Sequence, residues 1–359
     1  MIESKGRESF MKVAIVTLVG DFNYGNRLQN YALQEVLTTL GTEVVTVDNP
    51  SQPIMQWIKE HLVERVDGQK RLKSFADMRR EKNLRDFTKR YISMSEANFA
   101  SGDFDYFVVG SDQVWNPSFW GKDTECYSAK RYLLKNVEAS KRIAYAASFG
   151  VEELTPLWSP VFKEELSEFR AISVREASGT EIVERICGKS AEIVLDPTLM
   201  LTKEKWSQMA AKVQESDYVL SFFLGKETKQ KKEYIEKISR EHGCQIIDMN
   251  DKNNRYYYCK PEMLLGLIKN AKLVVTDSFH ATVFSVVFHT PFLSMTREQR
   301  NYCKMSSRLE TLLGMVKMTD CFNNMSLEDP FMCVFDNVDA IIEKKRKASL
   351  LFLKNALGV

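Results

Sequence analysis

The chain lacks the features of several large classes of protein. Its seven cysteines form no C-x-x-C pair and have no histidines at matching spacing, which argues against a disulfide framework and a zinc site. No run of about eighteen apolar residues occurs, so no transmembrane helix is expected. The formal net charge is only +2, which gives no general case for nucleic-acid binding. We therefore expect a cytoplasmic protein with no metal site and no nucleic-acid partner.

Length and composition indicate two globular domains. A chain of 359 residues is too long for a single domain with one ordinary hydrophobic core. Its composition, 44% hydrophobic and 27% charged residues, is typical of a folded, soluble protein. Strand and helix patterns alternate in both halves, which predicts two α/β domains at residues 11–190 and 191–330. A long amphipathic helix should follow at 335–359. Residues 1–10 lack the apolar core of a signal peptide and are expected to form a flexible extension.

The stretch at residues 272–288 is where we place the chemistry. Residues 272–276 form a short β-branched run, typical of a buried strand, and Asp277 and Ser278 are of the types that cap a helix. The helical spacing that follows places His280 in the first turn, beside unpaired backbone N–H groups. A histidine there more often packs or caps. The neighbouring hydroxyls and carboxylate favour an anion site with a proton donor, since ligands bind at strand ends in open α/β sheets.

An asparagine-rich loop follows the first expected strand, residues 13–19. A helix should then run to Leu40, and the loop glycines fit neither a dinucleotide-binding motif nor a P-loop. Its amides suit sugar hydroxyls or a phosphate, although asparagine often serves only turn geometry. The candidates for contact with a sugar acceptor are Asn23, Asn26 and Gln29.

A second polar loop follows the expected strand at residues 105–109. It carries Asp112, Gln113 and Trp115. A carboxylate, an amide and an indole on one loop are suited to gripping a carbohydrate, because polar groups pair with hydroxyls while the ring covers C–H surface. Trp115 as a plain core residue is an equally good interpretation.

Two arginines lie where helices are expected to begin. Arg175 follows the strand expected at residues 171–174, and Arg308 lies at the start of a helix that two serines precede. An arginine at a strand end such as Arg175 is either part of a surface ion pair or a fork for phosphate or carboxylate.

Two basic segments are candidates for contact with an anionic membrane. Residues 53–92 look helical, and residues 59–90 contain eleven Lys or Arg against six Asp or Glu, an excess of five. This could be a basic amphipathic hairpin at a membrane surface, but a solvated helical insertion that packs on its own domain is favoured. The last helix carries a basic run at 344–347, which either binds anionic lipid or packs back across the first domain.

Six short blocks resemble the polysaccharide pyruvyl transferase family. They read N-Y-G-N-R-L-Q-N-Y-A-L-Q (23–34), V-G-S-D-Q-V-W-N-P (109–117), S-V-R-E (173–176), L-D-P-T (195–198), T-D-S-F-H-A-T-V-F-S (276–285) and S-R-L (307–309). They occur in that family's order and span nearly the whole chain from residue 11 to about residue 314. The resemblance implies two Rossmann-like domains that face each other across a cleft, as in GT-B glycosyltransferases.

The resemblance also implies an activity. Characterised members transfer pyruvate from phosphoenolpyruvate to a sugar of a cell-surface polysaccharide or its lipid-linked precursor, which forms a ketal and releases phosphate. It therefore implies phosphoenolpyruvate as co-substrate with no other cofactor, and a lipid-linked sugar as acceptor. Together with the basic segments at 59–90 and 344–347, such an acceptor would place the cytoplasmic protein at the inner membrane face. Where the family motif reads Arg-x-His, this chain has Ser278-Phe279-His280, so one cationic donor ligand is missing.

Taken together, the residues and the resemblance predict a ketal transferase. We expect His280 to donate the proton to the enol carbon and Asp112 to act as base for the sugar. The expected donor-binding set is Arg175, Ser278, Phe279 and Arg308. Two alternatives stay open: a glycosyltransferase that uses a nucleotide-sugar, and a non-catalytic carbohydrate-binding member of a capsule assembly complex.

Overall fold

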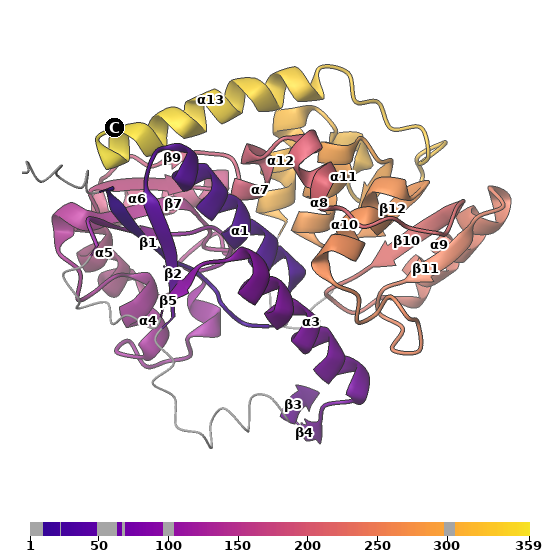
Figure 1. Cartoon of the computed structure of the whole chain (residues 1–359), viewed down its shortest axis with the longest axis horizontal. Helices are drawn as coiled ribbons and strands as arrows, with labels where there is room; N and C mark the ends of the chain where they lie inside the picture. Colours follow the sequence, from indigo (N-terminus) through magenta and orange to yellow (C-terminus); the bar gives the residue numbers. More distant parts are fainter. Residues whose placement is uncertain (1–9, 22, 49–62, 67–68, 96–103, 298–305) are drawn as a thin grey trace, which may run out of the picture.

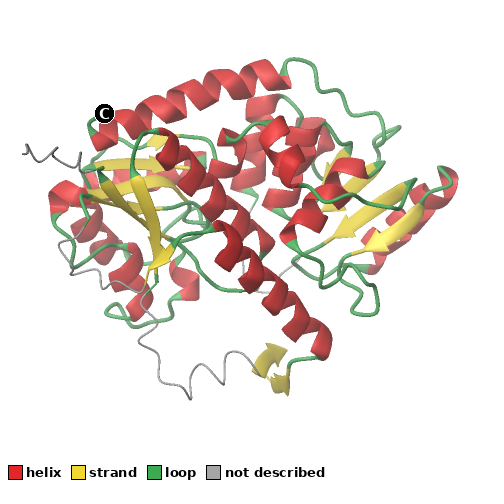
Figure 2. Cartoon of the chain, viewed as in Figure 1, coloured by secondary structure: helices red, strands yellow, loops and turns green. Residues whose placement is uncertain are grey.

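Two parallel β-sheets with helices packed against them form the molecule (Figures 1 and 2). The computed structural model describes the chain except for residues 1–9, 22, 49–62, 67–68, 96–103 and 298–305. The seven-stranded sheet has the order β5-β2-β1-β6-β7-β8-β9, and the four-stranded sheet has the order β11-β10-β12-β13. This confirms the predicted pair of Rossmann-like α/β domains. The expected extension at residues 1–10 lies almost entirely outside the described residues.

In its described residues, the first domain contains the seven-stranded sheet and five helices. Its strands are β1 (Lys12–Val16), β2 (Glu43–Val47), β5 (Met94–Ser95), β6 (Tyr106–Val109), β7 (Arg142–Ala147), β8 (Ala171–Val174) and β9 (Glu192–Ile193). Its helices are α1 (Tyr24–Thr39), α3 (Phe75–Tyr91), α4 (Tyr127–Tyr132), α5 (Ser159–Ser167) and α6 (Ala177–Cys187), with 3₁₀ turns at Pro117–Phe119 and Ala139–Lys141. Because β9 pairs with β8, the first sheet extends past the predicted boundary at residue 190.

The second domain contains the four-stranded sheet. Its strands are β10 (Tyr218–Phe222), β11 (Gln245–Asp248), β12 (Leu273–Thr276) and β13 (Phe292–Ser294). Its helices are α9 (Lys229–Glu241), α10 (Pro261–Asn270), α11 (Phe279–Phe288) and α12 (Ser307–Val316), and a 3₁₀ turn lies at Thr319–Cys321. The short helices α7 (Pro197–Met200) and α8 (Lys203–Met209) connect the two domains.

One hydrophobic core runs through both domains. It includes residues of the first sheet, of α1, of α11 and of the second sheet. Trp206 of α8 lies at the centre, where its ring makes edge contacts with Tyr31 of α1 at 5.8 Å and Phe284 of α11 at 5.0 Å. α1 and α11 therefore pack on the same side chain, although they belong to different domains.

The last helix, α13 (Val338–Leu357), crosses from the second domain back over the first (Figure 1). Arg346 donates to the backbone carbonyls of Leu199 and Leu201 at 2.6 and 2.8 Å, and the Ser349 hydroxyl accepts the Leu195 N–H at 3.0 Å. Arg170 of the first domain donates to the Ala356 carbonyl at 2.9 Å, so the prediction that this helix packs across the first domain is confirmed. None of the described helices has both the length and the apolar composition that a membrane span requires.

The predicted helical insertion at residues 53–92 is wrong in part. Residues 53–62 lie outside the described part, and an antiparallel hairpin of β3 (Val63–Val66) and β4 (Gln69–Leu72) then precedes α3. The segment V-E-R-V-D-G-Q-K-R-L has an Asp-Gly pair at its centre, which is a signal for a two-residue hairpin turn that the helical interpretation overlooked. In the second half of α3 the apolar side packs inward, with Phe87 against Tyr31 of α1, whereas Phe75 at its start is exposed.

Candidate active site

The turn from β12 into α11 forms as the sequence predicts. β12 is buried and lies inside its sheet, and the Ser278 hydroxyl caps α11 by accepting the Ala281 N–H at 3.4 Å. The Asp277 carboxylate accepts the backbone N–H groups of Leu224 and Gly225 at 2.6 and 2.8 Å. These bonds fix the ends of two neighbouring strands to each other. His280 therefore has a rigid position in the first turn of α11.

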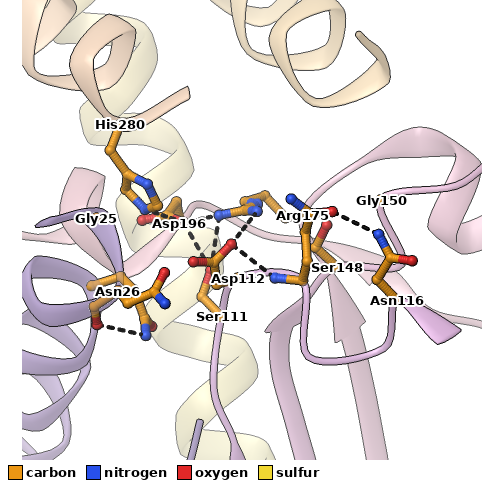
Figure 3. A network of polar contacts seen from close by, with 12 residues as sticks. Gly25, Asn26, Ser111, Asp112, Asn116, Ser148, Gly150, Arg175, Asp196 and His280 are labelled. Atoms are coloured by element: carbon orange, nitrogen blue, oxygen red, sulfur yellow. Dashed lines mark hydrogen bonds and ion pairs between the residues drawn. The ribbon is translucent and has the colours of Figure 1, made fainter. Parts of the chain in front are cut away.

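His280 faces a carboxylate that comes from the other domain (Figure 3). Its Nε2 lies 3.7 Å from Oδ2 of Asp196, and this buried nitrogen has no hydrogen-bond partner among the described residues. Asp196 precedes α7 and is itself buried. Ser111 and Arg175 also contact Asp196 Oδ2, at 2.8 and 2.6 Å. Asp196 thus connects His280 with the strand ends of the first sheet.

Asp196 is ionised in this environment. Its burial would raise its pKa, but contacts with His280, Arg175 and Thr198 outweigh burial and hold the pKa of Asp196 well below its usual range. A fixed negative charge beside an imidazole orients the ring. Asp196 therefore suits a positioning role for His280.

Arg175 lies at the carboxyl end of β8 and is buried. Its Nη1 donates to Asp196, and its Nη2 lies 3.6 Å from Oδ1 of Asp112. Burial would lower the pKa of Arg175, but the negative charges of Asp196, Asp112 and Glu176 outweigh burial and raise the pKa above its usual value. Nε and Nη2 have no hydrogen-bond partner in the described part of the chain. A cation with two donor atoms available is thus held in the site.

Phe279 brings the two predicted arginines together. The guanidinium carbon of Arg175 lies 4.3 Å from the centroid of its ring, and that of Arg308, from the second domain, lies 5.8 Å from it. Burial, followed by the positive charge of Arg175, lowers the pKa of Arg308 to about 10. Two buried cations that repel each other form a site that an anion would stabilise. The four predicted donor-binding residues, which include Ser278, thus lie within one cluster.

Asp112 belongs to the same cluster but has the properties of a weak base. Its backbone has a left-handed φ of 77°, and its carboxylate accepts the Gln113 N–H at 2.8 Å. Burial would raise its pKa, but Arg175, His280 and Arg308 lower the pKa of Asp112 below its usual value. A carboxylate with a lowered pKa accepts a proton less readily. The geometry suits Asp112 better to holding Arg175 than to its predicted role as base for the sugar.

The asparagine-rich segment is helix rather than loop. α1 begins at Tyr24, with Asn23 as its N-cap, so Asn26 and Gln29 lie inside the helix. Gln29 is fully buried and donates to the Thr17 hydroxyl at 2.9 Å, which leaves it no surface for a sugar. Asn26 lies beside Gly25, near His280 (Figure 3), and its Oδ1 has no partner among the described residues. Of the three acceptor contacts predicted in this segment, Asn23 and Asn26 remain predictions, and the structure does not favour Gln29.

The second predicted acceptor loop packs into the first domain. Trp115 is fully buried, its indole N–H donates to the Tyr132 carbonyl at 2.9 Å, and its ring packs on Phe149 at 5.2 Å. The core interpretation of Trp115 therefore holds, because no face of the ring is left for a sugar. Gln113 is buried too, and its carbonyl oxygen accepts from Asn116 at 2.7 Å.

Two residues of the site were not predicted. A Cβ added to Gly25 would lie 2.1 Å from Nδ1 of His280, so only glycine allows α1 to approach this closely. Asp196 lies in the L-D-P-T block, but no role was predicted for it. The sequence around Asp196 reads as a buried strand that ends in Asp-Pro, which places a carboxylate at a strand end. Nothing in the neighbouring sequence shows that this carboxylate faces His280, 84 residues later in the chain.

Comparison with known proteins agrees with the motifs. The family model described as polysaccharide pyruvyl transferase matches residues 23–299, which is most of the chain. A search among curated proteins finds no match.

Several solved structures are weakly similar over the whole chain. A UDP-N-acetylglucosamine 2-epimerase from Rickettsia bellii is 9% identical, with 98% of each chain covered and a TM-score of 0.46. A second UDP-N-acetylglucosamine 2-epimerase is 10% identical, with 96% of this chain and 95% of that chain covered and a TM-score of 0.48. MurG from Acinetobacter baumannii is 9% identical, with 97% and 95% covered and a TM-score of 0.38. Likenesses this weak carry no conclusion about activity.

Proposed function

The chain belongs to the polysaccharide pyruvyl transferase family, and we propose that it transfers pyruvate from phosphoenolpyruvate to a sugar of a cell-surface polysaccharide or its lipid-linked precursor. The product is a ketal, and phosphate is released. The observation that carries this proposal is the pair of buried arginines on the ring of Phe279, next to His280. Phosphoenolpyruvate has two anionic groups and needs a proton on its enol carbon, so it matches both parts of the cluster.

The arginines account for donor binding although one family cation is missing. Ser278 stands where the family motif has arginine, and here its hydroxyl caps α11. Positive charge is supplied instead by Arg175 and Arg308, which reach the same ring from the two domains. The backbone N–H groups at the start of α11 add the positive end of a helix dipole. The phosphate and the carboxylate of the donor would each have a cationic partner.

The reaction needs one proton donor of defined orientation. His280 gives a proton to the methylene carbon of the enol, and a sugar hydroxyl oxygen bonds to C2. A second hydroxyl oxygen of the same sugar then bonds to C2 as the bond between C2 and the phosphate oxygen breaks. Of the two hydroxyl protons, one restores His280 and the other leaves with phosphate. Ionised Asp196, whose Oδ2 lies 3.7 Å from Nε2 of His280, holds the imidazole in position.

The proposal places the enzyme near a membrane-bound acceptor. Of the basic run on α13, Arg346 is used in packing, whereas Lys344, Lys345 and Lys347 are exposed. Exposed lysines on one helix are attracted to anionic lipid at low salt. We propose that this face of α13 contributes to peripheral association with the inner membrane face.

A direct test is an acceptor screen. Purified protein is incubated with phosphoenolpyruvate and aryl or lipid-linked galactosides, mannosides and acetylhexosamines, while phosphate release and acceptor mass are followed. We expect phosphate release that depends on one class of acceptor, with pyruvate found on the sugar. Absence of phosphoenolpyruvate binding, together with sugar transfer from a nucleotide-sugar, would contradict the proposal.

A further inference from the structure

A groove of about 710 Å³ lies apart from the active-site cluster, between α3 of the first domain and the second domain. We call it the basic groove and define it by Arg79, Arg90, Lys212, Arg255, Tyr258 and Lys260. α3 supplies the first two residues, and the chain before β10 and before α10 supplies the others. Its volume is in the range of pockets that hold small ligands.

Four of the five cations of the basic groove have no ion-pair partner in the described part of the protein. Its lining contains five Lys or Arg and one acidic residue, Glu262. Arg255 pairs with Glu215, whereas the other four cations form no ion pair with a described residue. All five are exposed. A concave surface with this excess of positive charge concentrates anions.

Tyrosines hold two of the arginines in place. The guanidinium carbon of Arg79 lies 4.3 Å from the ring centroid of Tyr258, and that of Arg90 lies 5.1 Å from the ring centroid of Tyr91. A guanidinium stacked on a ring keeps its N–H edge free to donate to an oxyanion. These side chains are therefore partly ordered before any ligand binds.

Direct bonds tie the two walls of the groove together. The Asp77 carboxylate of α3 accepts from Lys252 at 2.6 Å and from the Tyr257 hydroxyl, and Asn83 donates to the Tyr258 carbonyl at 2.5 Å. Burial would raise the pKa of Asp77, but hydrogen bonds from Lys252, Ser74 and Tyr257 lower it to about 2. The groove is thus fixed by the contact between α3 and the second domain.

The basic groove and His280 lie close to the same turn of α1. The Tyr24 hydroxyl donates to the carbonyl of Cys259, which lines the groove, at 2.8 Å. The next residue, Gly25, packs on the imidazole of His280. Two consecutive residues of α1 therefore contact the groove wall and the proton donor. An acceptor with a sugar at His280 could extend its charged portion toward the groove.

We propose that the basic groove binds the diphosphate of a diphosphate-linked sugar acceptor. This inference rests on the proposed function and names the chemistry of its acceptor. Several cations around one groove match the multiple charges of a diphosphate, and arginine forks match its oxygens. The phosphate of a membrane lipid headgroup offers the same chemistry from another source.

The test uses the full chain and inorganic diphosphate as the probe. Calorimetry compares wild type, the double variant Arg79→Ala/Lys260→Ala and the control Arg185→Ala/Lys229→Ala, which removes two exposed cations outside the groove. The groove variant should bind diphosphate about tenfold more weakly, while the control binds normally. The loss should also appear in an Arg175→Ala background, which separates the groove from the donor site. Unchanged diphosphate affinity in the groove variant would overturn the inference.

Two further measurements separate the sources of phosphate and the two proposals. The groove variant should sediment with phosphatidylglycerol vesicles as wild type does, because the groove is assigned to the acceptor. Lost vesicle binding with normal diphosphate binding would assign it to lipid headgroups instead and refute the inference. Phosphoenolpyruvate affinity should be equal in wild type and groove variant. If wild type binds no phosphoenolpyruvate, the proposed function fails. The inference about the basic groove then depends only on whether the groove variant loses diphosphate binding.

Discussion

Replacing Gly25 by alanine should reduce activity by displacing His280. The added Cβ would lie 2.1 Å from Nδ1 and 2.6 Å from Cγ of the imidazole, whereas ordinary contact begins at 3.4 Å. The ring must therefore move by about 1.3 Å, the difference between 3.4 and 2.1 Å. A misplacement of about 1 Å can cost roughly 10²-fold in rate, so we expect a fall of about that size in phosphate release.

The fold should survive this change. Alanine favours helix over glycine by roughly 0.5–1 kcal/mol, which offsets part of the steric cost in α1. Gly314→Ala in α12 is the matched control, because nothing lies within 4 Å of its added Cβ. The assay is acceptor-dependent phosphate release, with circular dichroism to verify the fold. A wild-type rate for Gly25→Ala would refute the placement of His280 against α1.

Three more predictions follow from the packing and charges. Arg175→Ala and Arg308→Ala should each weaken phosphoenolpyruvate binding by roughly 1.5–3 kcal/mol in calorimetry, and normal affinity in both would place the donor elsewhere. Asp77→Asn should lower stability by about 1–2 kcal/mol at neutral pH. The pKa of Asp77 in the folded state is lowered to about 2, so its carboxylate stabilises the fold only while it is ionised. The difference in unfolding free energy between wild type and variant, measured with denaturant, should therefore disappear as pH falls from about 4 to 2. A difference that does not change with pH would contradict this prediction. Trp115→Ala should destabilise the fold by roughly 3–5 kcal/mol, and a small effect would contradict its core role.

The local parts of the site could be predicted from the sequence. The β12–α11 turn has a β-branched run, a capping serine and helical spacing within a short stretch, and each of these acts on near neighbours. Arg175 and Arg308 were predictable in the same way, as residues at helix starts. Their common contact with Phe279 was not, because it depends on how the two domains pack.

The remaining features depend on tertiary contacts. The buried state of Gln29 follows from its bond to Thr17 inside the first domain, and polarity alone suggested exposure. The indole of Trp115 has the same chemistry in a core as in a sugar site, so only packing distinguishes the two. The pairing of Asp196 with His280 joins opposite domains and has no local signal.

The measurement that tests the central claim most directly compares two histidine variants in the acceptor-dependent phosphate assay. His280→Gln should lower turnover roughly 10²- to 10⁴-fold, the usual loss for a missing general acid, while the fold is retained. His289→Gln is the control, since that ring lies at the other end of α11, 3.0 Å from Asp339 Oδ1, and should remain near the wild-type rate. An unchanged rate for His280→Gln, or an equal loss in both variants, would contradict the assignment of His280 as proton donor.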